Sequence, residues 1–105
     1  MLEYIDISYN RLSGSIFPGL FELPHLTHVY LQRNMFDGWI PATAAASKVL
    51  RVLCAEHNCL SGEPPSGWVS SQLEELHLHD NSFIDSELAR IRLFSELPES
   101  CHITV

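Results

Sequence analysis

A thirteen-residue pattern of apolar and polar positions opens the chain and returns three more times. The four copies are LEYIDISYNRLSG at 2–14, LTHVYLQRNMFDG at 26–38, LRVLCAEHNCLSG at 50–62 and LEELHLHDNSFID at 73–85. Each has an apolar residue at the first, fourth and sixth places, Asn at the ninth and an apolar residue at the eleventh, with Ala55 as the small exception. This pattern predicts a short strand that leads into a turn.

The copies recur at a nearly fixed period. Their asparagines stand at positions 10, 34, 58 and 81, so the spacings are 24, 24 and 23 residues. A period in this range predicts a solenoid, in which stacked coils bury one continuous core within a single domain spanning 1–105. The expected coils run over about 2–25, 26–49, 50–72 and 73–97. The chain is either a small complete array or a fragment of a longer one.

After the asparagine, the first three copies continue in a related way. The continuation reads LSGSI at 12–16, FDGWIP at 36–41 and LSGEPP at 60–65. Over about residues 1–85 the chain resembles the leucine-rich repeat family, specifically its plant-type class with the consensus LxxLxLxxNxLSGxIP. The resemblance implies an α/β solenoid with a short parallel β-sheet on the concave face and a mostly irregular convex side.

The carboxyl end departs from the repeat. The stretch SELARIRLFSELPE predicts a helix with Ser86 as its N-cap and Pro98 as its stop. Apolar residues recur every three positions along it: Leu88, Ile91, Phe94 and Leu97. The CHITV segment at 101–105 then predicts a last short strand. We expect this helical segment to close the array as an atypical terminal coil.

The asparagines have a structural role that their chemistry predicts. An Asn side chain has both a donor and an acceptor, so it can satisfy backbone groups left unpaired as the chain leaves a strand. A single Asn would be explained by its preference for turns. Four in register favour a ladder of stacked side chains, formed by Asn10, Asn34, Asn58 and Asn81.

The polar positions of the predicted strands project from the concave face, which the resemblance implies is the partner-binding surface. Three Tyr and four of the six His in the chain fall there. Tyr is enriched in protein interfaces because it offers a large contact area with a polar tip. The alternative is an ordinary solvated sheet face. The expected binding residues are Tyr4, Asp6, Tyr9, His28, Tyr30, Gln32, Arg33, Glu56, His57, His77, His79 and Asp80.

Composition and charge narrow the class of partner. The chain is 46% hydrophobic and 18% charged, which is typical of a globular protein. Its formal net charge of −7 argues against nucleic acid, whose phosphates would be repelled. No stretch reaches the roughly 18 apolar residues of a membrane-spanning helix, so membrane insertion is not expected. The sequence therefore predicts a protein partner.

Chemical activity is a weaker alternative. Neighbouring coils place Cys54 beside His77, Glu56 beside His79 and His57 beside Asp80, which suggests a metal site on the concave face. A flat sheet splays its side chains, however, and the spacing matches no zinc motif. A thiol hydrolase built on the first of these pairs lacks an oxyanion hole and a third orienting group. We therefore predict no enzyme, metal or cofactor.

Two further expectations concern compartment and assembly. An odd number of cysteines, the absence of an N-x-S/T sequon and the absence of a basic-then-apolar leader favour an intracellular protein. The first predicted coil has no neighbour on one side, which leaves Leu2, Ile5 and Ile7 at an open edge. The second candidate function is therefore a structural subunit that docks by this N-terminal edge in a larger assembly.

Overall fold

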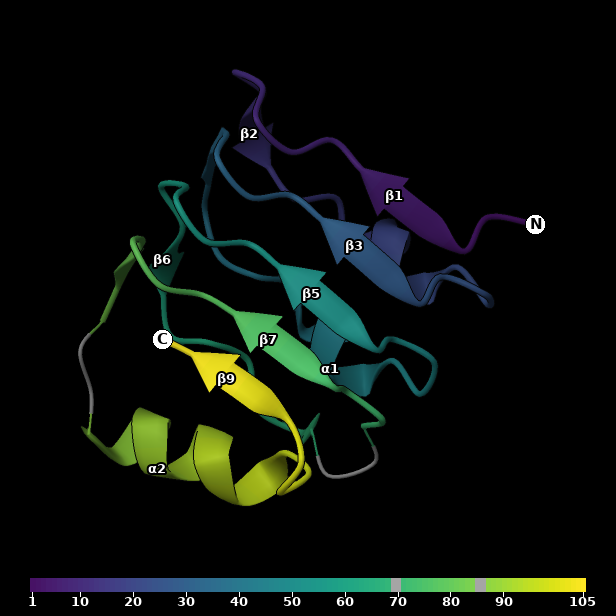
Figure 1. Cartoon of the computed structure of the whole chain (residues 1–105). Coiled ribbons are helices and arrows are strands. Elements are labelled where there is room, and N and C mark those ends of the chain that lie inside the picture. The colour runs from purple at the N-terminus through teal and green to yellow at the C-terminus, as the bar shows by residue number, and fades with distance from the viewer. Residues whose placement is uncertain (69–70, 85–86) are drawn as a thin grey trace.

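The structure is a computed structural model that describes residues 1–68, 71–84 and 87–105. Five parallel strands form the main sheet, in the order β1-β3-β5-β7-β9 (Figure 1). Their bounds are Tyr4–Asp6 for β1, His28–Tyr30 for β3, Val52–Cys54 for β5, Glu75–His77 for β7 and His102–Thr104 for β9. Each coil contributes one strand, so the predicted α/β solenoid is confirmed.

Two smaller parallel sheets lie past the turn that follows each main strand. Strand β2 (Ser13–Ser15) pairs with β4 (Met35–Asp37), and β6 (Ser61–Gly62) pairs with β8 (Ser82–Phe83). The convex side carries the 3-10 helix η1 (Pro18–Glu22) and the short helix α1 (Ala42–Ala46), which lie behind the main sheet in Figure 1. The sequence did not predict the smaller sheets.

The repeat in the sequence becomes a stack in space. Adjacent strands pair at equivalent repeat positions, so that the central residue of each strand faces its counterpart in the next coil. This inner row consists of Ile5, Val29, Leu53, Leu76 and Ile103. Its three middle members are fully buried. Trp68, at one of the convex-side leucine positions, is also fully buried and donates its indole N–H to the Pro65 carbonyl at 2.7 Å.

The repeated asparagines tie each coil to the one before it. The Asn58 amide nitrogen donates to the Leu31 carbonyl of the preceding coil at 3.0 Å and to two carbonyls of its own coil. Its Oδ1 accepts the Phe36 backbone N–H, also of the preceding coil, at 3.0 Å. Asn34 and Asn81 repeat both contacts. These bonds cross every junction between the four repeats.

Asn10 differs from the other three asparagines. Its side chain is exposed, and within the described residues it donates only to the Ile7 and Ser8 carbonyls of its own coil. Asn34, in contrast, is only 8% exposed. Position 10 therefore shares the repeat pattern but lacks the contacts between coils.

The terminal helix α2 (Glu87–Glu96) packs on the array by a face that its predicted apolar row reaches only at its last member, Leu97. Leu93 and Leu97 are buried in the core. Leu88, Ile91 and Phe94 are instead 67%, 58% and 52% exposed. Because an α-helix has 3.6 residues per turn, side chains spaced by three move progressively around the helix axis. Leu93 and Leu97, which are spaced by four, lie on nearly the same side. The predicted N-cap Ser86 lies outside the described residues.

No helix in the three described ranges combines the length and the apolar character needed to cross a bilayer.

We predict that Asn58→Ala lowers the free energy of unfolding by about 3 kcal/mol, because it breaks contacts between coils and leaves backbone groups without partners. Asn10→Ala is the matched control and should cost less than about 1 kcal/mol, because its bonds are local and exposed. Urea unfolding followed by circular dichroism measures both. Equal losses in the two variants would contradict the structural role given to the ladder.

Candidate functional site

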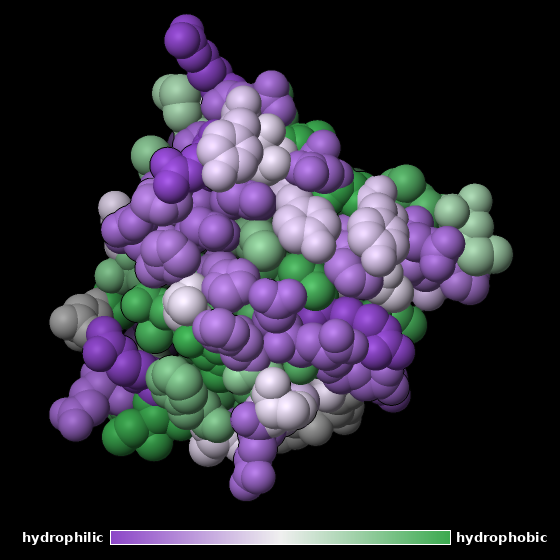
Figure 2. Space-filling model, viewed as in Figure 1, coloured by the Kyte–Doolittle hydropathy of each residue, from purple (hydrophilic) through white to green (hydrophobic). Residues whose placement is uncertain are grey.

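The twelve residues expected to bind a partner all lie on a main-sheet strand or in the turn that follows it. Figure 2 shows that this side of the molecule is mainly hydrophilic. Val52 and Cys54, which occupy the equivalent positions on β5, are buried. His102 and Thr104 of β9 extend the surface beyond the four repeats. We call the surface formed by these twelve residues, together with His102 and Thr104, the concave face.

The amino-terminal end of the concave face is aromatic. The rings of Tyr4 and His28 stack with centroids 4.0 Å apart and planes 5° from parallel, and Tyr30 lies 6.3 Å farther along. Thr27 Oγ1 lies 2.8 Å from His28 Nδ1 and restrains that ring. Burial, followed by nearby Cys54 and acidic groups, raises the pKa of Tyr30, so its phenol stays protonated. This end offers a neutral, flat surface for apolar and aromatic contacts.

The carboxyl-terminal end of the concave face gathers histidines. The ring centroids of His57 and His79 are 5.3 Å apart, and those of His77 and His102 are 5.5 Å apart. Thr104 Oγ1 lies between two of these rings, 2.8 Å from His77 Nδ1 and 2.7 Å from His79 Nδ1. His77 Nε2 is 3.2 Å from Glu75 Oε1.

The turn residues form a second connected row. The Arg33 guanidinium lies 5.5 Å from the centre of the Tyr9 ring and donates to His57 Nε2 at 3.3 Å. His57 Nδ1 in turn lies 3.1 Å from Asp80 Oδ2. Of the three pairs predicted from the sequence, this last one is in direct side-chain contact.

Two buried acceptors on the concave face lack a donor. Gln32 Oε1 and Glu56 Oε1 are shielded from solvent and have no hydrogen-bond partner in the part of the chain that the structure describes. An unsatisfied buried acceptor costs free energy that a bound donor recovers. These two atoms occupy equivalent positions in neighbouring coils, so rotation of the two side chains could present both acceptors to a donor group bound on this face.

The environment of Cys54 opposes nucleophilic chemistry. Burial, followed by the negative charge of Glu56, Glu75 and Asp6, raises the pKa of this thiol to about 12. The reactive form of cysteine is the thiolate. His77 is its register partner in the next strand, but a thiol that stays protonated at neutral pH is a poor nucleophile.

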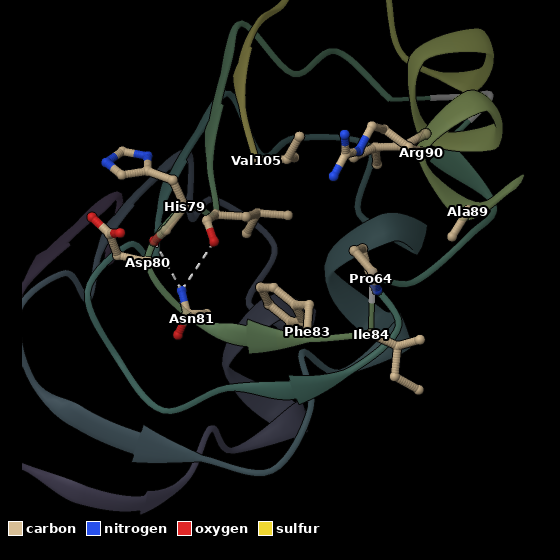
Figure 3. A pocket seen from close by; sticks show the side chains of 11 residues that line it. Pro64, His79, Asp80, Asn81, Phe83, Ile84, Ala89, Arg90 and Val105 are labelled. Carbon is tan, nitrogen blue, oxygen red and sulfur yellow. Dashed lines mark hydrogen bonds between the residues drawn. The ribbon is translucent and has the colours of Figure 1, made fainter. Parts of the chain in front are cut away.

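A cavity of about 290 Å³ lies where α2 meets the last repeat. Phe83, Ile84 and Pro64 line one side, whereas Val105 and Arg90 approach from the other (Figure 3). His79 and Asp80 stand at its edge, next to the concave face. Sequence reasoning missed this cavity because it depends on how α2 packs, which the repeat pattern does not encode. A side chain of a partner bound on the concave face could enter it.

The family model described as Leucine Rich Repeat matches residues 1–23. Receptor-like protein 41 of Arabidopsis thaliana is 37% identical over 89 residues, which are 81% of this chain and 10% of that protein. The chain therefore spans about a tenth of the length of this curated relative.

Two solved structures from Arabidopsis have the same fold. The ectodomain of the receptor kinase HAESA, in complex with an N-terminally extended IDA peptide hormone, is 29% identical with a TM-score of 0.75. That match covers 78% of this chain and 14% of the HAESA chain. A chain of the BIR3–SERK2 complex is 33% identical with a TM-score of 0.73, over 96% of this chain and 53% of that one.

The prediction of an intracellular compartment is wrong. The curated relative is a receptor-like protein, and the HAESA structure is a receptor ectodomain, which points to the extracellular side of a membrane. The prediction relied on the cysteine count, the absence of an N-x-S/T sequon and the absence of a leader sequence. None of these features is informative for a chain that spans so small a part of its relatives.

We predict that Cys54 reacts with iodoacetamide at pH 8 roughly a thousandfold more slowly in the folded chain than in the denatured chain, because so little of it is thiolate. Mass spectrometry of peptides after timed labelling measures the rate. The exposed Cys59 is the internal control, since its labelling should change far less on folding. Rapid labelling of Cys54 in the folded chain would contradict a protonated, shielded thiol.

The repeat motif, the stacked coils and the comparisons with known proteins agree. The two solved structures share the fold of this chain, in which each repeat contributes one main-sheet strand. This chain therefore belongs to the leucine-rich repeat family, in its plant-type class.

Proposed function

We propose that the chain is a non-catalytic module that binds a partner protein through its concave face. The observation that carries this proposal is the pair of buried acceptors without donors, Gln32 Oε1 and Glu56 Oε1, within the described part of that face. A surface that served only as a solvated sheet would have little reason to keep two shielded acceptors side by side.

The charge of the concave face indicates the chemistry of the partner. Among the twelve candidate residues, three are acidic and only Arg33 carries a fixed positive charge. The acidic residues are Asp6, Glu56 and Asp80, and the exposed side chain of Glu75 on β7 adds a fourth carboxylate beside them. A segment with Lys or Arg side chains supplies both positive charge and the missing donors.

The two ends of the concave face would then have different roles. The stacked pair Tyr4 and His28, together with Tyr30, offers a rigid contact area near β1. Rigid aromatic side chains lose little entropy on binding, which suits them to anchor a partner. The acidic and histidine-rich end near β7 would favour partners that carry positive charge.

The similar solved structures support protein recognition as the general activity. The HAESA ectodomain was solved with a peptide hormone, and the other structure is a complex of BIR3 with SERK2. These ligands belong to those proteins. For this chain they favour a peptide or protein over a small metabolite as the class of ligand.

The size of the face limits the affinity expected of this chain alone. Five strands about 4.8 Å apart, each showing about five residues at about 3.3 Å, present roughly 400 Å². A standard interface takes about 800 Å² from each partner. The turn row from Tyr9 to Asp80 and the cavity beside α2 enlarge the contact, and we expect binding in the micromolar range (about 10⁻⁶ M).

We predict that peptides selected on the purified chain from a phage-displayed library carry a net positive charge. Tyr30→Ala should weaken their binding about 10-fold by removing an anchor. Glu56→Gln, which keeps the shape but removes the charge, should weaken it several-fold and reduce its dependence on salt. Biolayer interferometry measures the affinities.

Trp39→Ala is the matched control, because this exposed aromatic residue lies beyond β4, away from the concave face. Its affinity should equal that of the native chain. A second control, Leu2→Glu, tests the alternative of docking through the edge of β1. Loss of binding in these variants together with full binding in Tyr30→Ala would reject the concave face as the site.

A further inference from the structure

We propose that His57, His79 and Asp80 form a binding site for a divalent transition metal ion, with Zn²⁺ as the best fit. One ligand atom from each residue lies within 4.8 Å of the other two. Imidazole nitrogen and carboxylate oxygen together suit zinc, whereas Mg²⁺ and Ca²⁺ prefer sites built from oxygen. This inference stands apart from the proposed protein binding and does not depend on it.

The hydrogen bonds around His79 leave one of its ring nitrogens available to a metal. His77 Nε2 faces the Glu75 carboxylate at 3.2 Å and must therefore carry a proton, because a carboxylate can only accept. If the other nitrogen, Nδ1, carries no proton, it accepts, and the Thr104 hydroxyl donates to it.

In that arrangement the same hydroxyl accepts from His79, because it has only one proton to donate. His79 thus carries its proton on Nδ1 and leaves the lone pair of Nε2 free. A metal-ligating histidine typically has this arrangement, in which the other ring nitrogen donates to an oxygen that fixes the tautomer. Thr104 is a positioning residue here.

A hydrogen bond holds His57 and Asp80 together. In the absence of metal, His57 Nδ1 donates to Asp80 Oδ2 at 3.1 Å, and His57 Nε2 accepts from Arg33 at 3.3 Å. A metal ion in the place of the Nδ1 proton would bind both partners of that hydrogen bond. The remaining proton of the ring would then sit on Nε2, where it opposes the Arg33 donor.

Arg33 therefore competes with the metal in two ways, by its charge and by its hydrogen bond. Its guanidinium has a second partner in the Tyr9 ring, 5.5 Å from the ring centre, toward which it can turn. Metal binding should move Arg33 away from His57. Removing the Arg33 charge should strengthen metal binding, a result that a merely structural role for the histidines would not produce.

The backbone holds the site in place before any metal arrives. His57 and Asp80 both have left-handed φ values of 56°, and the His57 N–H donates to the His79 carbonyl at 3.1 Å. Ligand atoms around a tetrahedral zinc at about 2.0–2.1 Å lie roughly 3.4 Å apart. The three side chains would have to rotate to bring ligand atoms that lie within 4.8 Å of one another to that spacing, and water can take the fourth position.

Isothermal titration of the untagged chain with ZnCl₂ tests the proposal. We expect saturable binding of one zinc per chain, unaffected by excess MgCl₂. His57→Ala, His79→Ala and Asp80→Asn should each weaken it by at least about 10-fold, since even outer-shell changes cost about 10–100-fold. Arg33→Gln should bind zinc several-fold more tightly. Circular dichroism checks that each variant is folded, and His79→Gln replaces His79→Ala if the latter is not.

His28→Ala is the matched control, because this histidine lies at the other end of the concave face, stacked on Tyr4. It should bind zinc as the native chain does. Thr104→Val should weaken binding by about 10-fold. It should also change the nitrogen NMR signals of His79 from the Nδ1–H tautomer to a mixture. Absence of saturable binding below about 1 mM zinc, or equal binding in His57→Ala, His79→Ala and His28→Ala, would overturn the proposal.

Discussion

The structure depends on hydrogen bonds that a single coil cannot make for itself. As the chain leaves each main-sheet strand, backbone groups turn inward with no strand partner, and a buried group of this kind costs free energy if it stays unpaired. Asn58 satisfies three carbonyls and one N–H, and half of those partners lie in the preceding coil. Each coil is therefore stable only against a neighbour, which makes the array cooperative.

The stacking of coils also fixes the position of the residue that precedes each asparagine. The residue before each asparagine has a left-handed φ between 56° and 59°, and for Tyr9, Arg33 and His57 its N–H donates to a carbonyl of the next coil. Because this conformation recurs in all four repeats, it belongs to the architecture rather than to one site. It places four chemically different side chains in one row, and contacts run from each to the next.

The sequence predicted the features of the fold that recur in every repeat, and it did not predict those that depend on the packing of the helix and the turns. The spacing of the asparagines was enough to predict the solenoid and the alignment of Leu53 with Leu76, whereas the family was suggested by the resemblance of the repeat motif. It could not predict the packing of α2, because a row such as Leu88, Ile91 and Phe94 is apolar whether or not it faces the core. The smaller sheets depend on how the turns pack, and the cavity near Phe83 depends on how α2 packs; no single repeat encodes either.

On the concave face, contacts between equivalent repeat positions could likewise be predicted from the sequence, whereas contacts with the terminal strand could not. Repeat positions alone brought His57 next to Asp80, because equivalent places in adjacent coils are neighbours. The hydrogen bond of His79 Nδ1 could not be read from the repeats, since its partner Thr104 lies on the strand after the helix. That strand keeps the register of the main sheet, with Ile103 opposite Leu76, although it follows the helical segment rather than a regular repeat. An irregular terminal coil can therefore add specific chemistry to a face whose geometry the regular coils determine.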